Sequence, residues 1–242
     1  WKWFVFSLVL FTAIAYVVVR YSTPKYKAQG KIQIIDDQNS GGLDLFKDLE
    51  LFAGSGNEVE DEIDIITSRS NFIDVVRQLG LNTTVYSQGN IKSTELYEDS
   101  PINVNLILPD SMALDTNFEF FLNVISETKF RYSEEEDVQG KTYGFGKNVK
   151  TPLGNIVITP RITDIKDFSN RKLRVNIRPV EDVAVYYKKN IKVAVSQEFS
   201  NILSISIEDA VKEKARDIIN TLTNIYNKNA IDDKQEIADK TS

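Results

Sequence analysis

The longest uninterrupted run of uncharged, mostly apolar residues lies at the N-terminal end of the chain. Residues 3–19 (WFVFSLVLFTAIAYVVV) carry no charge and lie between Lys2 and Arg20. As an α-helix with a rise of 1.5 Å per residue they would span about 26 Å, close to the thickness of the hydrocarbon layer of a bilayer. Aromatic residues stand at both ends of the run, as is typical of the two membrane interfaces. The pattern predicts a transmembrane helix over residues 1–21.

A cleaved signal peptide is the alternative interpretation of this run. Ala13-Ile14-Ala15 has the small-x-small form of a cleavage site. The apolar run continues through residues 17–19 beyond that site, which favours a helix that is retained. Because the chain starts without Met and ends at Ser242 inside a helical pattern, we expect it to be an internal piece of a longer protein.

The segment that follows the apolar run alternates and then becomes helical. Alternating apolar positions predict a strand over 26–35, and apolar spacing predicts a short amphipathic helix over 43–52. A longer helical region is expected over 58–79, with a break at 67–71, where capping residues are frequent. Gly80 fits a left-handed C-cap at its end.

The pattern changes again between residues 82 and 179. Short β-branched and aromatic runs alternate with Asp, Asn, Gly and Pro, which favours antiparallel strands joined by turns. The strands expected here are 102–108, 118–125, 129–132, 155–159 and 172–177. After them the sequence predicts a short helix at 180–190 and a strand pair at 191–195 and 202–207.

The final segment predicts a long helix that begins at Glu208-Asp209. Its apolar positions follow helical spacing, namely Val211, Ala215, Ile218, Leu222 and Ile225. Apolar residues become sparse after Tyr226. The first half of this helix should therefore pack on a sheet, and its second half should extend away from the domain. We expect strand 26–35 to pair with 191–195 or 202–207, with helices 58–79 and 209–226 covering one face.

Composition excludes several kinds of chemistry. The chain has 29 Lys and Arg against 35 Asp and Glu, a net charge of −6, and neither His nor Cys. The acidic balance argues against a nucleic-acid partner. Without His or Cys there is no Cys/His zinc site, thiol nucleophile, Ser-His-Asp triad or disulfide. We therefore expect no catalytic residue, no metal and no cofactor in this chain.

Two charged clusters are the remaining candidates for binding. The acidic run 134–137 is best interpreted as a solvated hairpin tip. Arg171, Lys172, Arg174 and Arg178 form a basic cluster on a predicted strand. Because side chains alternate along a strand, Arg174 and Arg178 share one face, and Arg171 lies on the other. That face is either a solvated surface in salt bridges or a contact for an anionic saccharide or a lipid headgroup.

The order of these features resembles the Wzz-type chain-length determinant domain of bacterial polysaccharide co-polymerases. The apolar helix leads to a P-x-Y element at Pro24 and Tyr26, followed by a strand. Further elements that resemble the family are Ser68-Arg69 with Leu79-Gly80-Leu81, and Ile202 to Asp209 with Ala215, Asn220 and Tyr226. The resemblance covers about 1–82 and 190–242. The segment between is similar to an inserted β domain, as in the larger Wzc-like members that are fused to a cytoplasmic tyrosine autokinase.

The resemblance implies an α+β architecture and a place in the cell. Residues 1–21 would be the transmembrane helix, 22–82 with 180–226 a mixed α/β periplasmic base, 83–179 a β-rich insertion, and 227–242 the start of a projecting helix. It implies a bacterial inner-membrane protein with residues 22–242 periplasmic.

The resemblance also implies the partners. The protein would form a homo-oligomeric ring and act with the polysaccharide polymerase and the export machinery, regulating the length and export of a capsular polysaccharide, exopolysaccharide or O-antigen. This chain would not be an enzyme, and the resemblance leaves open a kinase domain outside it.

Two other functions fit parts of the pattern. The extracytoplasmic sensing domain of a membrane receptor would also have an N-terminal membrane helix, an α+β domain and an exit helix. Its exit helix should soon become apolar, whereas 227–242 is polar. A membrane-anchored enzyme acting on glycans is the third interpretation, and no motif supports it.

Overall fold

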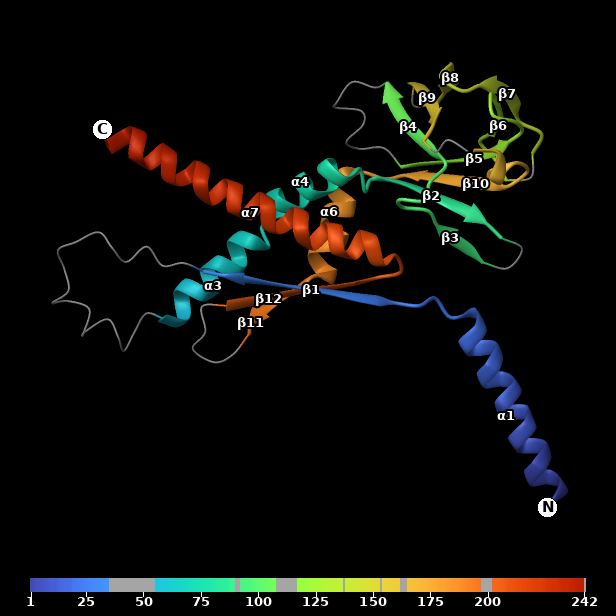
Figure 1. The fold of residues 1–242 in the computed structure, drawn as a ribbon, viewed down its shortest axis with the longest axis horizontal. Coiled ribbons are helices and arrows are strands. Elements are labelled where there is room, and N and C mark those ends of the chain that lie inside the picture. Colours follow the sequence, from blue (N-terminus) through green and yellow to red (C-terminus); the bar gives the residue numbers. More distant parts are fainter. Residues whose placement is uncertain are drawn as a thin grey trace.

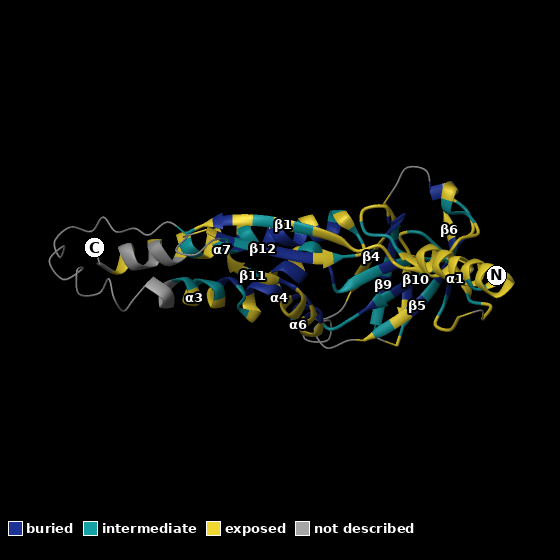
Figure 2. Ribbon diagram, turned by 90° about the horizontal axis from the view of Figure 1, so that it is seen from below, coloured by how far each residue is buried: buried dark blue, intermediate teal, exposed yellow. Residues whose placement is uncertain are grey.

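The computed structural model describes residues 1–34, 55–89, 92–107, 117–136, 138–152, 154–161, 165–196 and 202–241 of an α+β protein. Helix α1 (Lys2–Tyr21) projects from one end, and the C-terminal end of α7 (Lys212–Thr241) lies at the other (Figure 1). The helix α1 is long and apolar enough to cross a membrane, and none of its residues is buried (Figure 2). The helix predicted for residues 1–21 is confirmed.

A three-stranded antiparallel sheet joins the two ends of the chain. The central strand β12 (Ile202–Asp209) pairs with β1 (Tyr26–Gln33) on one side and with β11 (Lys192–Val195) on the other. Alternate residues of β12 are fully buried because one face of the sheet is covered by helices. The predicted pairing of the first strand with the late strands is therefore confirmed.

Four helices cover that sheet. They are α3 (Ser55–Ile66), α4 (Arg69–Leu79), α6 (Val180–Asn190) and α7. Figure 1 shows α7 lying along β1 and β12, with α4 and α6 beside it. Gly30 permits the close approach of α7, because a Cβ atom on this residue would lie 2.8 Å from Cγ2 of Ile219.

The expected break between the first two of these helices is present. The side chain of Ser68 caps α4 by accepting a hydrogen bond from the backbone N–H of Asn71. The amide of Asn71 donates to the carbonyl of Ile65 at 2.9 Å, which ties the end of α3 to the start of α4. Gly80 ends α4 with a φ of 64°, as the sequence predicted.

The chain between α4 and α6 forms two antiparallel sheets. One has the strand order β3-β2-β10-β5-β6-β7 and the other the order β4-β9-β8. The strands are β2 (Thr83–Gln88), β3 (Ser93–Glu95), β4 (Ile102–Ile107), β5 (Phe118–Val124), β6 (Lys129–Ser133), β7 (Lys141–Gly144), β8 (Asn148–Thr151), β9 (Gly154–Pro160) and β10 (Lys172–Ile177). A short 3₁₀ helix, η1 (Ile165–Phe168), precedes β10.

Buried hydrophobic side chains gather in two clusters. The first lies between the three-stranded sheet and its helices and draws on residues 32–81 and 180–225. The second draws on both sheets of the β-rich segment, from residues 85–177. Figure 2 shows these buried positions along β12, α4 and α7 and again within the β-rich segment.

The structure corrects the start of the last helix. The sequence predicted that it begins at Glu208-Asp209, but both residues belong to β12, and α7 begins at Lys212. The carboxylate of Asp209 accepts a hydrogen bond from the backbone N–H of Val211 at 2.8 Å, so it caps the turn that leads into the helix. The short helix predicted for 43–52 lies outside the described residues.

Candidate functional site: a polar pocket beside the membrane-exit segment

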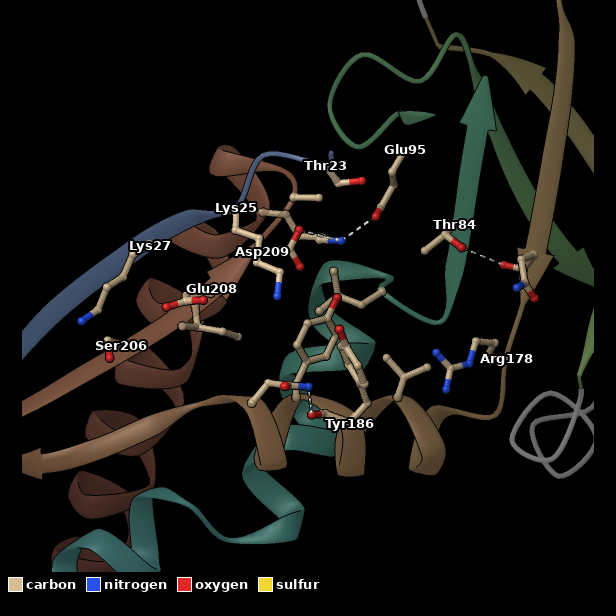
Figure 3. Close-up of a pocket in the computed structure, with 18 of the residues that line it drawn as sticks. Thr23, Lys25, Lys27, Thr84, Glu95, Arg178, Tyr186, Ser206, Glu208 and Asp209 are labelled. Atoms are coloured by element: carbon tan, nitrogen blue, oxygen red, sulfur yellow. Dashed lines mark hydrogen bonds and ion pairs between the residues drawn. The ribbon is translucent and has the colours of Figure 1, made fainter. Parts of the chain in front are cut away.

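A polar pocket of about 470 Å³ lies where the three-stranded sheet meets the β-rich segment. Its lining comes from the segment after α1, from β2, β10 and α6, and from the residues that join β12 to α7. Figure 3 shows Lys25 entering from the β1 side, Arg178 on the opposite side, and Tyr186 rising from α6 between them. The pocket therefore brings together residues that are far apart in the sequence.

A buried cation forms one wall of the pocket. Lys214 on α7 is 4% exposed, and its Nζ lies 2.7 Å from both carboxylate oxygens of Glu95 on β3. The same Nζ lies 3.1 Å from Oδ1 of Asp209. A buried ammonium group needs such partners, because an unpaired charge is costly in a low-dielectric environment. This cluster of Lys214, Glu95 and Asp209 joins three separate elements at a single point.

The neighbouring groups determine the protonation state of Lys214. Burial by itself would lower the pKa of Lys214, but Tyr187, Glu95 and Asp209 outweigh burial, and the pKa is raised. Burial is also the main reason that the pKa of Tyr187 is raised, so its hydroxyl keeps its proton at neutral pH. The two carboxylates are therefore the charges that hold Lys214 ionised.

A second set of contacts next to this cluster holds the β-rich segment against the same helix. The hydroxyl of Tyr97 donates to Oδ2 of Asp217 on α7 at 3.3 Å. Arg161 donates to the backbone carbonyl of Tyr97 at 3.1 Å, and Arg216 lies 3.9 Å from Glu98. Burial, together with the nearby Asp217 carboxylate, raises the pKa of Tyr97 to about 12. The residues just after β3 are thus fixed to the first turns of α7.

Four further cations line the pocket, namely Lys25, Lys27, Arg178 and Lys192. Among the residues that the structure describes, no acidic side chain lies within 4.0 Å of these four cations. Counting every charged lining residue gives five cations and three carboxylates, a local charge of +2 in a chain whose net charge is −6. The positive local charge attracts anions.

The structure separates the two arginines that the sequence grouped. Both alternate with the buried residues of β10, although Arg178 follows the strand rather than lying within it. The guanidinium of Arg174 stacks over the ring of Tyr86 at 4.9 Å from the centroid and lies 3.8 Å from Glu119. Arg178 lines the pocket, and Arg174 does not. Of these two arginines, therefore, only Arg178 is placed to contact a ligand in the pocket.

The membrane-exit element lies at the mouth of the same pocket. Pro24 stands between α1 and β1, and Tyr26 begins β1 opposite Asp209. Lys25 between them lines the pocket. The sequence singled out the flanking residues and missed this lysine.

Lys214 was also missed, although the sequence carries a signal for it. It stands three residues after Val211 and four before Ile218, which places a lysine on the apolar seam of α7. A charged residue in such a position indicates a buried, paired side chain. Its partner Glu95 lies on a short strand of few apolar residues, so no pattern in the sequence pointed to it.

Comparison with protein families gives a match at the N-terminal end of the chain. Residues 1–79 match the family model described as Wzz: Chain length determinant protein. This N-terminal third of the chain is therefore similar to the Wzz domain. The match spans α1, β1, α3 and α4 and ends at the last residue of α4. No curated protein gave a significant match to the chain.

The Wzz domain indicates a role in determining the length of polysaccharide chains. Together with the exposed apolar helix α1, it indicates a protein that is anchored in a membrane. A Wzz domain is not an enzymatic domain, which agrees with a non-enzymatic role for this chain. Strand β12 and helix α7 lie outside the match, yet they complete the sheet and the core to which residues 1–79 contribute.

Proposed function

We propose that this chain is the membrane-proximal part of a polysaccharide co-polymerase subunit, which regulates the chain length and export of a capsular polysaccharide, exopolysaccharide or O-antigen. The Wzz match over residues 1–79 carries this proposal, because it covers the apolar helix together with the first strand and helices of the folded part. In this proposal α1 lies in a bacterial inner membrane and residues 22–242 lie in the periplasm.

The division of the chain into parts belongs to the same proposal. Residues 22–82 and 180–226 would be the base, 83–179 an inserted β-rich unit, and 227–242 the start of a projecting helix. Support comes from the two hydrophobic clusters, which draw on these same two groups of residues. The packing of β1 against β12 supports a base that is assembled from both ends of the chain.

Assembly into a homo-oligomeric ring is part of the proposal. Helix α7 has 30 residues and at about 1.5 Å per residue reaches about 45 Å, which is longer than the sheet beneath it. Among the side chains of α7 that the structure describes, the buried ones extend to Ile225, whereas Ile231 is 56% exposed. Such a helix supports contacts with neighbouring subunits or with further helices of the full-length protein.

The proposed action is positional and not chemical. Ring geometry and polar surfaces near the membrane would control how long a growing glycan stays with its polymerase. The partners would be the polymerase, the export machinery and the polysaccharide itself. Among the residues that the structure describes, no group of three or more acidic side chains is placed to hold a metal ion.

A charge-reversal experiment tests the part played by the basic residues. In a strain that produces the polymer, the full-length protein with Arg174→Glu and Arg178→Glu should change polymer length or yield while it still inserts into the membrane. The matched control is Lys147→Glu with Lys150→Glu, two exposed lysines on or beside β8 and away from the pocket. Unchanged length and yield with the arginine variant would remove these arginines from the proposal.

A further inference from the structure

The pocket lies next to the C-terminal end of α1, the helix that could cross a membrane. Thr23, two residues after the end of α1, already lines it, and Lys25 follows two residues later. At about 3.5 Å per extended residue, Lys25 lies within about 14 Å of the helix end. The Nζ of Lys92 donates to the backbone carbonyl of Ser22 at 3.2 Å, so the connection between β2 and β3 reaches the same level.

Lipid headgroups occupy this level of a membrane. The polar layer on each side of the hydrocarbon core is about 5–8 Å thick, so a pocket that opens just beyond a membrane helix borders it. Lys25 lines the pocket, and Arg20 in the last turn of α1 and Lys92 at the carbonyl of Ser22 add positive charge at the end of the helix. Basic side chains next to a membrane helix attract anionic lipids, and basic pockets bind their headgroups.

The chemistry of the lining fits a phosphate group with a polar substituent. Lys25 and Arg178 face each other across the pocket and are free of carboxylate partners within the described ranges. Arginine and lysine are the side chains best suited to phosphate oxygens, through forked and point-charge contacts respectively. Tyr186 and Asn190 on α6 supply polar groups for the hydroxyls of a headgroup. A volume of about 470 Å³ accommodates such a group without its acyl chains.

We propose that this pocket binds the phosphate headgroup of an anionic membrane lipid, with Lys25 and Arg178 as the main contacts and Lys27 and Lys192 at the rim. The acyl chains of the lipid would remain in the bilayer beside α1. The bound headgroup would hold the base at a fixed height and rotation relative to the membrane. This inference does not rest on the role in polysaccharide synthesis.

Native mass spectrometry of the chain in an uncharged detergent tests the proposal. The probes are palmitoyl-oleoyl phosphatidylglycerol and the matched phosphatidylcholine. We expect the chain to bind phosphatidylglycerol more tightly, and Lys25→Gln with Arg178→Gln to weaken that binding about twenty-fold. The control Lys147→Gln with Lys150→Gln removes the same charge from exposed positions outside the pocket and should leave the affinity unchanged.

A second variant guards against loss of folding. Lys25→Gln alone changes an exposed side chain before β1 and should weaken phosphatidylglycerol binding about five-fold with an unchanged thermal unfolding curve. Equal affinity for the two lipids, or the same loss in the lysine control, would overturn the proposal. Binding of soluble uronic-acid oligomers by the wild-type chain but not by the Lys25→Gln and Arg178→Gln variant, without a preference for phosphatidylglycerol, would also overturn it and assign the pocket to a glycan.

Discussion

Replacing Lys214 removes the centre of the buried charge cluster and keeps most of its packing. In Lys214→Met, the unbranched stem remains and the ammonium group is lost. Glu95 and Asp209, with side chains 13% and 8% exposed, then remain as two carboxylates without their cation. Removing one partner of a buried ion pair costs about 3–5 kcal/mol, and partial exposure of Glu95 favours the lower end. We expect the free energy of unfolding to fall by about 3 kcal/mol.

Two further variants distinguish this effect from a general loss of charge. Arg216→Met lies two residues along the same helix, where the side chain is 60% exposed near Glu98 and Asp217. Exposed pairs contribute about 0–1 kcal/mol, so this variant should be close to wild type. Adding Glu95→Gln to Lys214→Met removes one of the unpaired carboxylates and should recover part of the lost stability.

The assay is urea denaturation of the detergent-solubilised chain, followed by far-UV circular dichroism. A change in midpoint with an unchanged slope reports stability and not a change in the unfolded state. If Lys214→Met and Arg216→Met are equally stable, the buried cluster does not stabilise the junction between α7 and β3, and the reasoning is refuted.

The pH dependence gives an independent check on Lys214. Its pKa is raised above the ordinary value of 10.5, despite burial, by Tyr187 and the two carboxylates. A raised folded-state pKa contributes stability that is present below the unfolded pKa and is lost as pH rises through the folded one. The stability difference between wild type and Lys214→Met should therefore be constant between about pH 7 and pH 10 and decrease above pH 10.

Three further predictions concern packing and ionisation elsewhere in the same core. Gly30→Val should destabilise the fold by about 1–3 kcal/mol in urea denaturation, because even its Cβ would collide with Ile219; wild-type stability would show that α7 does not approach β1 closely. Leu222→Asp, at a fully buried position, should prevent the core beneath the three-stranded sheet from folding, as a protease-sensitivity assay would show. Burial and the hydrogen bond to Glu62 raise the pKa of Tyr226 to about 12. The Tyr226→Phe variant should therefore lose less stability than the wild type between about pH 10 and pH 12. Equal losses in the two proteins would contradict the raised pKa of Tyr226.

The sequence predicted those elements whose periodicity is governed by one buried face. Alternation in Ile202–Ile207 identified β12, and helical spacing in α4 and α7 identified their buried sides. Gly80 was identified because a left-handed C-cap favours glycine. These features depend on local chemistry, so they could be read from single segments of the chain.

The pocket could not be predicted in the same way because its walls come from distant segments. Polar strands such as β2 and β3 lack a regular apolar pattern, and they position Tyr86 and Glu95. Asp209 was assigned to the helix because acidic residues favour a helix N-terminus, but pairing with Tyr26 keeps it in β12. Tertiary pairing thus outweighed the local preference, and the cluster around Lys214 depends on that outcome.

The length distribution of the polysaccharide in the producing bacterium tests the central claim most directly. Deleting the gene for the full-length protein should change the distribution seen on a gel, and the wild-type gene should restore it. The gene encoding Leu222→Asp should not restore it, because the core shared by α7 and the Wzz-like residues 1–79 is lost. An unchanged distribution after deletion would contradict a role in chain-length determination.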